Sequence, residues 1–147
     1  MIRKTTIDEL PWVMGLFKAF EKETKFVLGD VDHAVKVYRR FLESGIGVVF
    51  ISMDHNRLQG GLAAIWAEDL HWRGRFAVET IWFVDPADRD MGVGTQLLNA
   101  FEEWAKSEGC HKVAMIHLSD SYPEILEQYY VSKGYQLMEK HYVKDIV

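Results

Sequence analysis

Cysteine is nearly absent from this chain of 147 residues, which holds Cys110 alone. A single cysteine cannot form an internal disulfide, and the six histidines show no metal-ligand spacing around it. We therefore predict a fold held by its apolar core, without a disulfide and without a metal. Because no activating partner is evident near Cys110, we expect it to be a small buried apolar side chain and not a nucleophile.

Long apolar runs and an excess of basic charge are absent as well. No segment approaches the roughly 20 residues that a membrane helix needs, and the N-terminus MIRKTTIDELPW lacks the apolar centre of a signal peptide. We expect a cytosolic protein that does not enter the membrane. The 17 basic residues against 22 acidic ones give a formal net charge of −5, which disfavours nucleic acid as a partner and leaves amines and basic peptides open.

The composition that is present is that of an ordinary globular protein. Apolar residues make up 48% of the chain and charged residues 27%. This length suffices for one domain, residues 1–147, to bury a core of its own. No linker, internal repeat or low-complexity segment divides it.

The first half of the sequence predicts two helices and a hairpin. Thr6-Ile7-Asp8-Glu9 has the form of a capping box, and apolar residues at helical spacing extend this helix to about Phe20. Asp32 and Gly45 are the start and stop signals of a second helix. The predicted strands are residues 46–53 and 58–67, around a turn at 54–57, with a short strand at Ile2 before the first helix.

The second half predicts strands that alternate with helices. Residues 77–84 are apolar except for Glu79 and Thr80, which indicates a buried strand. Val93 begins the apolar face of a long helix that stops at Gly109. The remaining predicted elements are a strand at 112–118, a helix that begins with a capping box at 121–124 and ends near Gly134, and a last strand at 137–143.

This order of elements predicts an α/β (α+β) fold. We expect a mixed, mostly antiparallel central sheet flanked by about four helices. The late strand–helix–strand unit is expected to be a right-handed parallel crossover.

The most informative segment is Arg89-Asp90-Met91-Gly92-Val93-Gly94-Thr95, between the buried strand and the long helix. A helix N-terminus carries unpaired N–H groups and partial positive charge, and glycines let a phosphate approach the backbone closely. The alternative is that the glycines only permit a tight turn and close helix–sheet contact. A Walker loop and a dinucleotide fingerprint are both excluded by the missing Gly-Lys-Ser/Thr and third glycine, which disfavours nucleotide hydrolysis and hydride transfer.

This segment resembles the signature (R/Q)-x-x-G-x-(G/A) of the GNAT acyltransferase superfamily. Trp82-Phe83-Val84-Asp85-Pro86 is similar to the family's strand that ends in Val-x-Pro, and Tyr130-x-x-x-Gly134-Tyr135 is similar to its late Tyr-x-x-x-Gly-(Phe/Tyr). The three motifs occur in family order over about the second half of the chain. The resemblance implies an N-acetyltransferase that moves an acetyl group from acetyl-CoA to a primary amine by direct attack, with no metal.

The resemblance also implies where the cofactor binds. The loop amides are expected to hold the CoA pyrophosphate, while the opened strand pairs with the pantetheine arm and supplies an oxyanion donor. Three acidic residues of this region, Asp85, Asp88 and Asp90, add negative charge near an anionic cofactor and are expected to weaken its binding. The residues assigned to the cofactor are Trp82, Val84, Arg89, Met91, Gly92, Val93, Gly94 and Thr95.

Two residues are the catalytic candidates, Tyr130 and Glu79. By resemblance, the Tyr130 phenol lies next to the CoA sulfur and protonates the leaving thiolate; the alternative is aromatic packing in a helix. An ammonium substrate must lose a proton before it attacks, and burial would raise the pKa of Glu79 toward the useful range. Glu79 precedes Trp82 by an odd number of residues, so its direction stays open. An ion pair with Arg75 is its alternative.

The acceptor cannot be identified from the sequence. Four acidic residues around the first interhelical loop point to a cationic small molecule or peptide, although a solvated acidic surface is the ordinary explanation. They are Glu21, Glu23, Asp30 and Asp32. The alternative function is a non-catalytic acyl-CoA-binding regulatory or interaction domain, against which the presence of Tyr130 argues.

The roles of several aromatic residues and the oligomeric state stay open. The aromatic residues Trp66, Trp72 and Phe76 either line an acceptor pocket or cover the sheet. His111 and His117 are expected to be structural. The oligomeric state is hidden, and a homodimer is one of the assemblies that the sequence leaves open.

Overall fold

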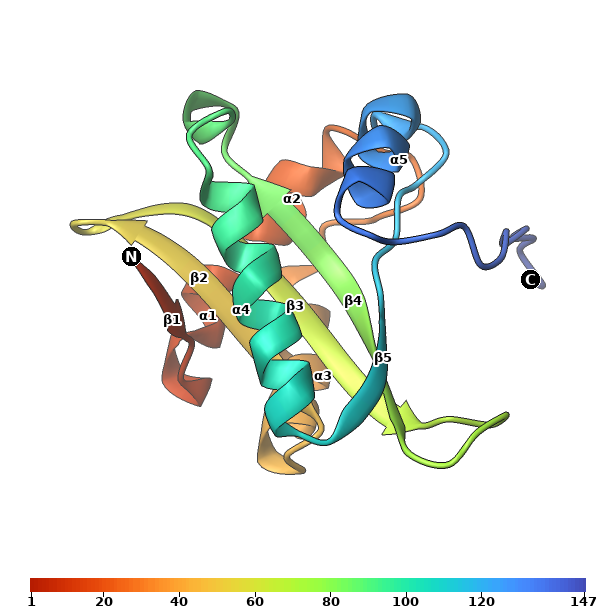
Figure 1. Ribbon diagram of the computed structural model, residues 1–147. Helices are drawn as coiled ribbons and strands as arrows, with labels where there is room; N and C mark the ends of the chain where they lie inside the picture. The colour runs from red at the N-terminus through yellow and green to blue at the C-terminus, as the bar shows by residue number, and fades with distance from the viewer. The chain divides into compact units, whose positions relative to one another are not determined.

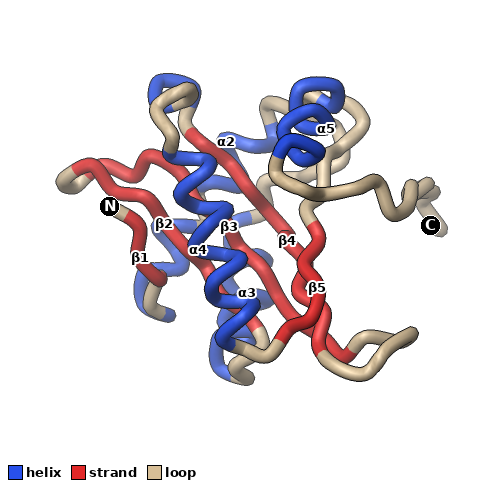
Figure 2. Tube along the Cα trace, viewed as in Figure 1, coloured by secondary structure: helices blue, strands red, loops and turns tan.

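The computed structural model describes all 147 residues, and the chain divides into two compact units, Met1–Ile116 and His117–Val147. The first unit is a five-stranded sheet with helices on both faces (Figures 1 and 2). Its strands follow one another in space as they do in the chain: β1 (Ile2–Lys4), β2 (Gly47–Asp54), β3 (Arg57–Glu68), β4 (Arg75–Val84) and β5 (Cys110–Ala114).

Neighbouring strands pair antiparallel up to β4, and β4 pairs with β5 in parallel. A parallel pair needs a long crossover, which α4 (Val93–Ser107) supplies. The predicted mixed, mostly antiparallel sheet is therefore confirmed. In Figure 1, α4 lies across one face of the sheet, while α1 (Leu10–Val13), α2 (Leu16–Glu21) and α3 (Val31–Glu43) lie on the other.

The main core of this unit lies between the sheet and the three N-terminal helices. Leu10, Val13 and Met14 are fully buried there, together with Ile51 of β2 and Ala63 of β3. The opposite face of the sheet is covered by the apolar side of α4, where the predicted residues Val93, Leu97, Leu98, Phe101, Trp104 and Ala105 are buried.

The predicted helix to Phe20 is broken into a short 3-10 turn (Ile7–Glu9), α1 and α2. A continuous helix would need Pro11 to donate a hydrogen bond to the Ile7 carbonyl, and proline has no N–H. Gly15, a poor helix former, then separates α1 from α2. α3 begins one residue before the predicted cap, because the Asp30 carboxylate accepts the His33 N–H at 3.0 Å.

The second unit contains one helix, α5 (Pro123–Ser132). The capping box predicted at 121–124 does not form, since Tyr122 occupies the cap position at φ 50° and no side chain caps the helix. The helix ends in a Schellman motif: Gly134 has φ 90°, its N–H donates to Val131 O, and the Tyr135 N–H donates to Tyr130 O, both at 3.0 Å.

The strand predicted at 137–143 is wrong. Residues 135–147 form neither helix nor strand, and the side chains from position 136 on are exposed. A strand exists through its hydrogen bonds to a neighbour, and the sheet ends at β5. β5 itself starts earlier than predicted and stops at Ala114, before the expected end at 118.

None of the helices combines the length and the apolar character needed to cross a bilayer.

Candidate active site

The site begins where β4 outlasts its parallel neighbour. β4 and β5 pair from Arg75 to Val78, and the last pair is Val78 with Ala114. From Glu79 to Val84, β4 pairs with β3 alone. The edge of this half-strand that faces away from β3 therefore has no neighbouring strand.

Main-chain groups of the open half of β4 point to that edge. The Asp85 N–H donates to Gln59 O of β3 at 2.8 Å. Because backbone direction alternates along a strand, the N–H of Phe83 also points to β3, and the N–H groups of Trp82 and Val84 point away from it. These are the two residues that the sequence predicted as backbone ligands of the pantetheine arm.

A β-bulge sets the direction of Glu79. Ala63 pairs with Ile81 and Ala64 with Glu79, so Thr80 is the extra residue. Directly paired residues share a face of the sheet, and consecutive residues of β3 lie on opposite faces. Glu79 therefore lies on the same face as Trp82, although an odd number of residues separates them. The alternation of side chains along a strand left the direction of Glu79 open, and the bulge determines it.

Glu79 is buried at the point where β4 and β5 part. Its side chain is 4% exposed, and its Oε2 accepts the Ile116 N–H at 3.1 Å. Burial raises the pKa of Glu79 to about 8, against the opposing effect of this hydrogen bond. The alternative ion pair with Arg75 is absent: Arg75 bonds to Glu108 O at 2.7 Å and lies 3.8 Å above the Trp66 ring.

The bulge is held by Tyr38 of α3, on the face of the sheet that carries α1, α2 and α3. The Thr80 hydroxyl donates to Ala63 O at 3.1 Å, so the Tyr38 hydroxyl, which bonds to Thr80, is the donor in that second bond. Burial is the first cause that raises the pKa of Tyr38 to about 12, and the nearby Glu79 adds to it. Sequence reasoning missed this contact, for which two polar residues within an apolar strand were the only sign.

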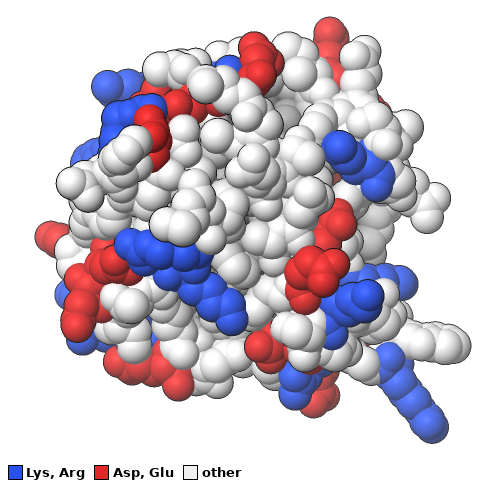
Figure 3. Space-filling model, turned by 60° about the vertical axis from the view of Figure 1, so that its left-hand side comes forward, with Lys and Arg blue, Asp and Glu red and all other residues white.

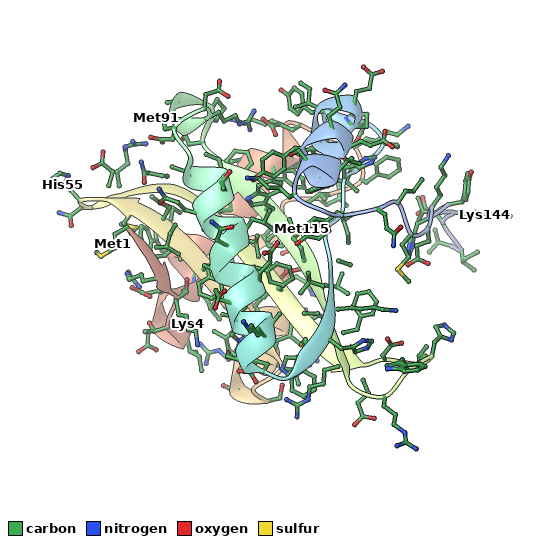
Figure 4. The ribbon with its side chains drawn as sticks, viewed as in Figure 1. Met1, Lys4, His55, Met91, Met115 and Lys144 are labelled. Carbon is green, nitrogen blue, oxygen red and sulfur yellow. The ribbon has the colours of Figure 1, made fainter.

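The loop before α4 has the backbone geometry of a helix start. Asp90 and Gly92 have φ of 67° and 81°, and the first bond of the helix joins the Gln96 N–H to Gly92 O at 3.0 Å. The amides of Val93 and Gly94 precede that bond and point out of the N-terminus, where the helix dipole favours an anion. Met91 lies at the tip of the loop, 66% exposed (Figure 4).

Gly94 has a packing role that the sequence left open as one of two readings. A Cβ at this position would lie 3.1 Å from Cζ2 of Trp82 and 3.7 Å from Cγ2 of Val84. The glycine thus lets α4 approach β4 closely, and it brings the helix start next to the two strand residues. A Cβ at Gly92 would meet nothing within 4 Å, but the left-handed φ would be strained for any other residue.

The loop is anchored by Asp88, which is 3% exposed. Arg57, the first residue of β3, holds both carboxylate oxygens at 2.6 and 2.7 Å, and Gln59 donates to one of them at 3.2 Å. Hydrogen bonding to Arg57 keeps the pKa of Asp88 below its usual range. Two of the three acidic residues expected to repel a cofactor are thus bound within the fold, because Asp85 accepts the Ala87 N–H at 2.9 Å.

In the second unit, Tyr130 is 6% exposed within a group of aromatic rings. Its ring centroid lies 5.9 Å from that of Tyr135 and 6.5 Å from that of His117. The Schellman motif after α5 brings Tyr135 back to Tyr130, which explains the spacing of the late tyrosine–glycine–tyrosine motif in physical terms. His117 therefore has the packing contact of a structural histidine, although its buried Nδ1 has no hydrogen-bond partner.

Other side chains singled out in the sequence have structural contacts in the first unit. His111 Nε2 lies 2.8 Å from the Asp69 carboxylate. Cys110 is half-buried, and burial raises the pKa of its thiol, which disfavours a nucleophilic thiolate. Trp72 is 71% exposed. No group of three or more histidine, cysteine, aspartate or glutamate side chains is arranged to hold a metal ion.

The acidic residues of the first interhelical loop do not act alike. Glu21 and Asp30 border an open depression with Asp32 and Lys18. Glu23 instead binds Arg89 at 2.7 Å. On the face that Figure 3 shows, acidic and basic side chains are interspersed, so this face offers no patch of a single sign.

Comparisons with known proteins agree with this geometry. The sequence model of the acetyltransferase (GNAT) family matches residues 15–135. No curated protein matches the chain. A predicted acetyltransferase from Clostridium acetobutylicum, solved with acetyl-CoA, has a TM-score of 0.81 at 16% identity, over 99% of this chain and 96% of that chain.

Two further solved structures have the same fold. An aminoglycoside acetyltransferase from an uncultured soil metagenomic sample, in complex with sisomicin, has a TM-score of 0.78 at 18% identity, over 100% of this chain and 96% of that one. Glucosamine-6-phosphate N-acetyltransferase from Arabidopsis thaliana has a TM-score of 0.77 at 16% identity, over 100% and 98%. At these identities the structures share the fold alone.

Proposed function

Since the chain belongs to the GNAT family of acetyltransferases, we propose that it transfers the acetyl group of acetyl-CoA to a primary amine of a small molecule or peptide. The observation that carries this proposal is the open half of β4 beside the start of α4. A strand edge that can bind an extended amide chain lies next to a helix N-terminus that can bind its phosphates.

The cofactor site consists of main-chain groups. The amides of Met91, Gly92, Val93, Gly94 and Thr95 hold the pyrophosphate, whereas the Arg89 N–H donates to Pro86 O at 3.4 Å and only begins the loop. The backbone of Trp82 and the N–H of Val84 pair with the pantetheine arm, since the Val84 carbonyl already accepts Arg89 Nε at 3.0 Å. One of the two amides stabilises the oxyanion formed from the thioester carbonyl. The close packing of Gly94 against Trp82, which leaves no room for a Cβ without a shift of the neighbour, supports this arrangement, because it places the helix start beside the strand.

The amine attacks the thioester carbonyl carbon, and the carbon–sulfur bond then breaks. Glu79 is the proposed base, which accepts the ammonium proton directly or through water. A pKa of about 8 supports this role, since a base is most effective when its pKa lies near the working pH. Tyr130 is the proposed acid, whose phenol gives a proton to the CoA thiolate and regains one from solvent.

A cationic amine is the proposed acceptor class. The depression bordered by Glu21, Asp30 and Asp32 has one basic residue, Lys18, which lies 3.7 Å from Glu21. Its excess of carboxylates favours a substrate with more than one positive charge. The aminoglycoside acetyltransferase solved with sisomicin, a polycation, shows that this fold can accept such a ligand.

The test is a panel of amines with acetyl-CoA, followed by the release of free CoA thiol. Sisomicin, spermidine and a lysine-containing peptide span small and peptide acceptors. Turnover of at least one, with the acetyl group found on nitrogen by mass spectrometry, supports the proposal. Absence of both CoA binding in calorimetry and turnover of any amine would reject it. The single domain over residues 1–147, the cytosolic location and the homodimer stay predictions.

A further inference from the structure

The side chain of Arg89 contacts β4 and the segment between α2 and α3. Its Nε donates to Val84 O at 3.0 Å, and its Nη2 donates to the Glu23 carboxylate at 2.7 Å. The guanidinium carbon lies 5.5 Å from the centroid of the Phe83 ring. Three segments of the first unit therefore meet at one guanidinium group.

The contacts with Phe83 and Glu23 lie on the side of the sheet that carries α1, α2 and α3, and the Val84 carbonyl lies at the open edge of β4. Phe83 belongs to the core formed with those helices, and its ring packs edge-on against Phe20 of α2 at 6.2 Å. The loop glycines lie on the opposite face, where Gly94 approaches Trp82 and Val84. The Arg89 side chain thus crosses the end of β4, away from the start of α4.

Its partner Glu23 belongs to residues 22–30, which form neither helix nor strand between α2 and α3. The side chain of Glu23 is 17% exposed and that of Arg89 33%, so the ion pair is shielded more than most surface pairs. A charge-assisted hydrogen bond of this length is among the stronger contacts that an irregular segment can have. The segment also ends at Asp30, which borders the acidic depression.

We infer that Glu23 and Arg89 are positioning residues for the acceptor, which fasten segment 22–30 over the end of β4. This inference rests on the proposed function for its substrate. It assigns the Arg89 side chain to the acceptor side of the molecule and leaves the cofactor phosphates to the loop amides.

Glu23→Gln tests the pair, because it removes the charge and keeps the size. Lys22→Gln is the matched control: it removes one charge from the exposed neighbouring residue. Amide hydrogen exchange of residues 22–30 is measured without cofactor, and CoA affinity by calorimetry. We expect Glu23→Gln to speed exchange about tenfold, as loss of a charge-assisted hydrogen bond implies, with the Kd for CoA within about twofold of wild type.

Arg89→Gln should give the same acceleration of exchange, and the double variant should add little to either single change, since both remove one contact. With the best amine of the panel, Glu23→Gln should raise KM for the amine about fivefold and leave KM for acetyl-CoA within about twofold. A purely structural pair would change the two KM values alike.

Two results would overturn the inference. One is exchange in Glu23→Gln that equals that of Lys22→Gln. The other is a loss of CoA affinity of about tenfold or more in Arg89→Gln with exchange unchanged, which would return the side chain to the cofactor site. The exchange measurement needs neither cofactor nor acceptor, so it decides the role of the pair even if the wild-type protein binds no CoA and the proposed function fails.

Discussion

The two halves of β4 have the same neighbour on one side and different surroundings on the other. From Arg75 to Val78 the strand lies between β3 and β5, and from Glu79 to Val84 it has β3 alone. In the first half, main-chain groups on both sides of the strand form hydrogen bonds within the sheet. In the second half, main-chain groups on one side point to an edge that a ligand can use. The change occurs at Glu79 and Thr80, where the bulge falls.

The comparison teaches that the bulge and the buried carboxyl belong to one arrangement. If Thr80 were paired regularly and did not bulge, Glu79 would lie on the opposite face from Trp82. In its actual position it takes up the Ile116 N–H where β5 leaves the ladder. The residue that marks the end of strand pairing is thus also the proposed base.

The largest effect is expected from Glu79→Gln, at the boundary between the halves. Glutamine keeps an oxygen for the Ile116 N–H but cannot accept the ammonium proton. We expect turnover to fall about 10³-fold, within the range of general-base effects, with CoA affinity little changed. Steady-state kinetics with the best amine, beside calorimetry, measures both. Full turnover in this variant would confine Glu79 to holding the strands apart.

Tyr130→Phe tests the proposed proton donor to the CoA thiolate. The ring and its contacts with Tyr135 and His117 are kept, and the phenolic proton is lost. Turnover should fall about 10²-fold, the lower end of general-acid effects, at an unchanged melting temperature. If turnover is intact, the phenol is packing alone, and a bound water is the acid.

A smaller effect is expected at the helix start, where the open half ends. Gly92→Ala and Gly109→Ala place a side chain at φ values of 81° and 78°, and neither Cβ meets an atom within 4 Å. Each should cost about 1–2 kcal/mol of stability. Because Gly92 alone lies in the proposed cofactor loop, only its variant should weaken CoA binding, by about tenfold. Equal affinities in the two variants would argue for a purely structural turn.

The last effect is on stability against pH. The pKa of Glu79 is about 8 in the folded protein, above the unfolded value of about 4.3, so the folded state holds its proton more tightly. The free energy of unfolding should therefore fall as pH rises between these values, by at most about 1.4 kcal/mol per pH unit from this group. Glu79→Gln lacks this contribution. Denaturation at pH 5 to 8 measures the difference, and parallel curves for both proteins would show that Glu79 is not buried in its neutral form.

Much of the fold was predictable because its elements carry local signals. The apolar face of α4 and the glycine after it give the helix, and apolar runs around a polar turn give the β2–β3 hairpin. The strand predicted at 137–143 fails because its apolar residues need a partner that no local pattern specifies. The break at Pro11 could be predicted from the sequence, since proline cannot donate a hydrogen bond within a continuing helix.

The positions of the site residues along the chain were predictable, but several of their contacts were not. The glycine loop and the strand before it were found from sequence, whereas the face of Glu79 depends on a bulge that alternation cannot reveal. The pairing of Glu23 with Arg89, 66 residues apart, had no local sign. Contacts between distant charged side chains depend on the fold, and no sequence motif announces them.

The buried anchor at Asp88 has a consequence for the thermodynamics of cofactor binding. Arg57 and Gln59 hold its carboxylate, and Gln59 is itself held by Ser52 at 2.8 Å, so the residues that lead into the proposed cofactor loop are fixed by the β2–β3 hairpin. Ordering a backbone residue costs about 1–2 kcal/mol in conformational entropy. Here that entropy is lost when the chain folds, so a ligand meets a preorganised loop and its contacts count almost fully towards affinity.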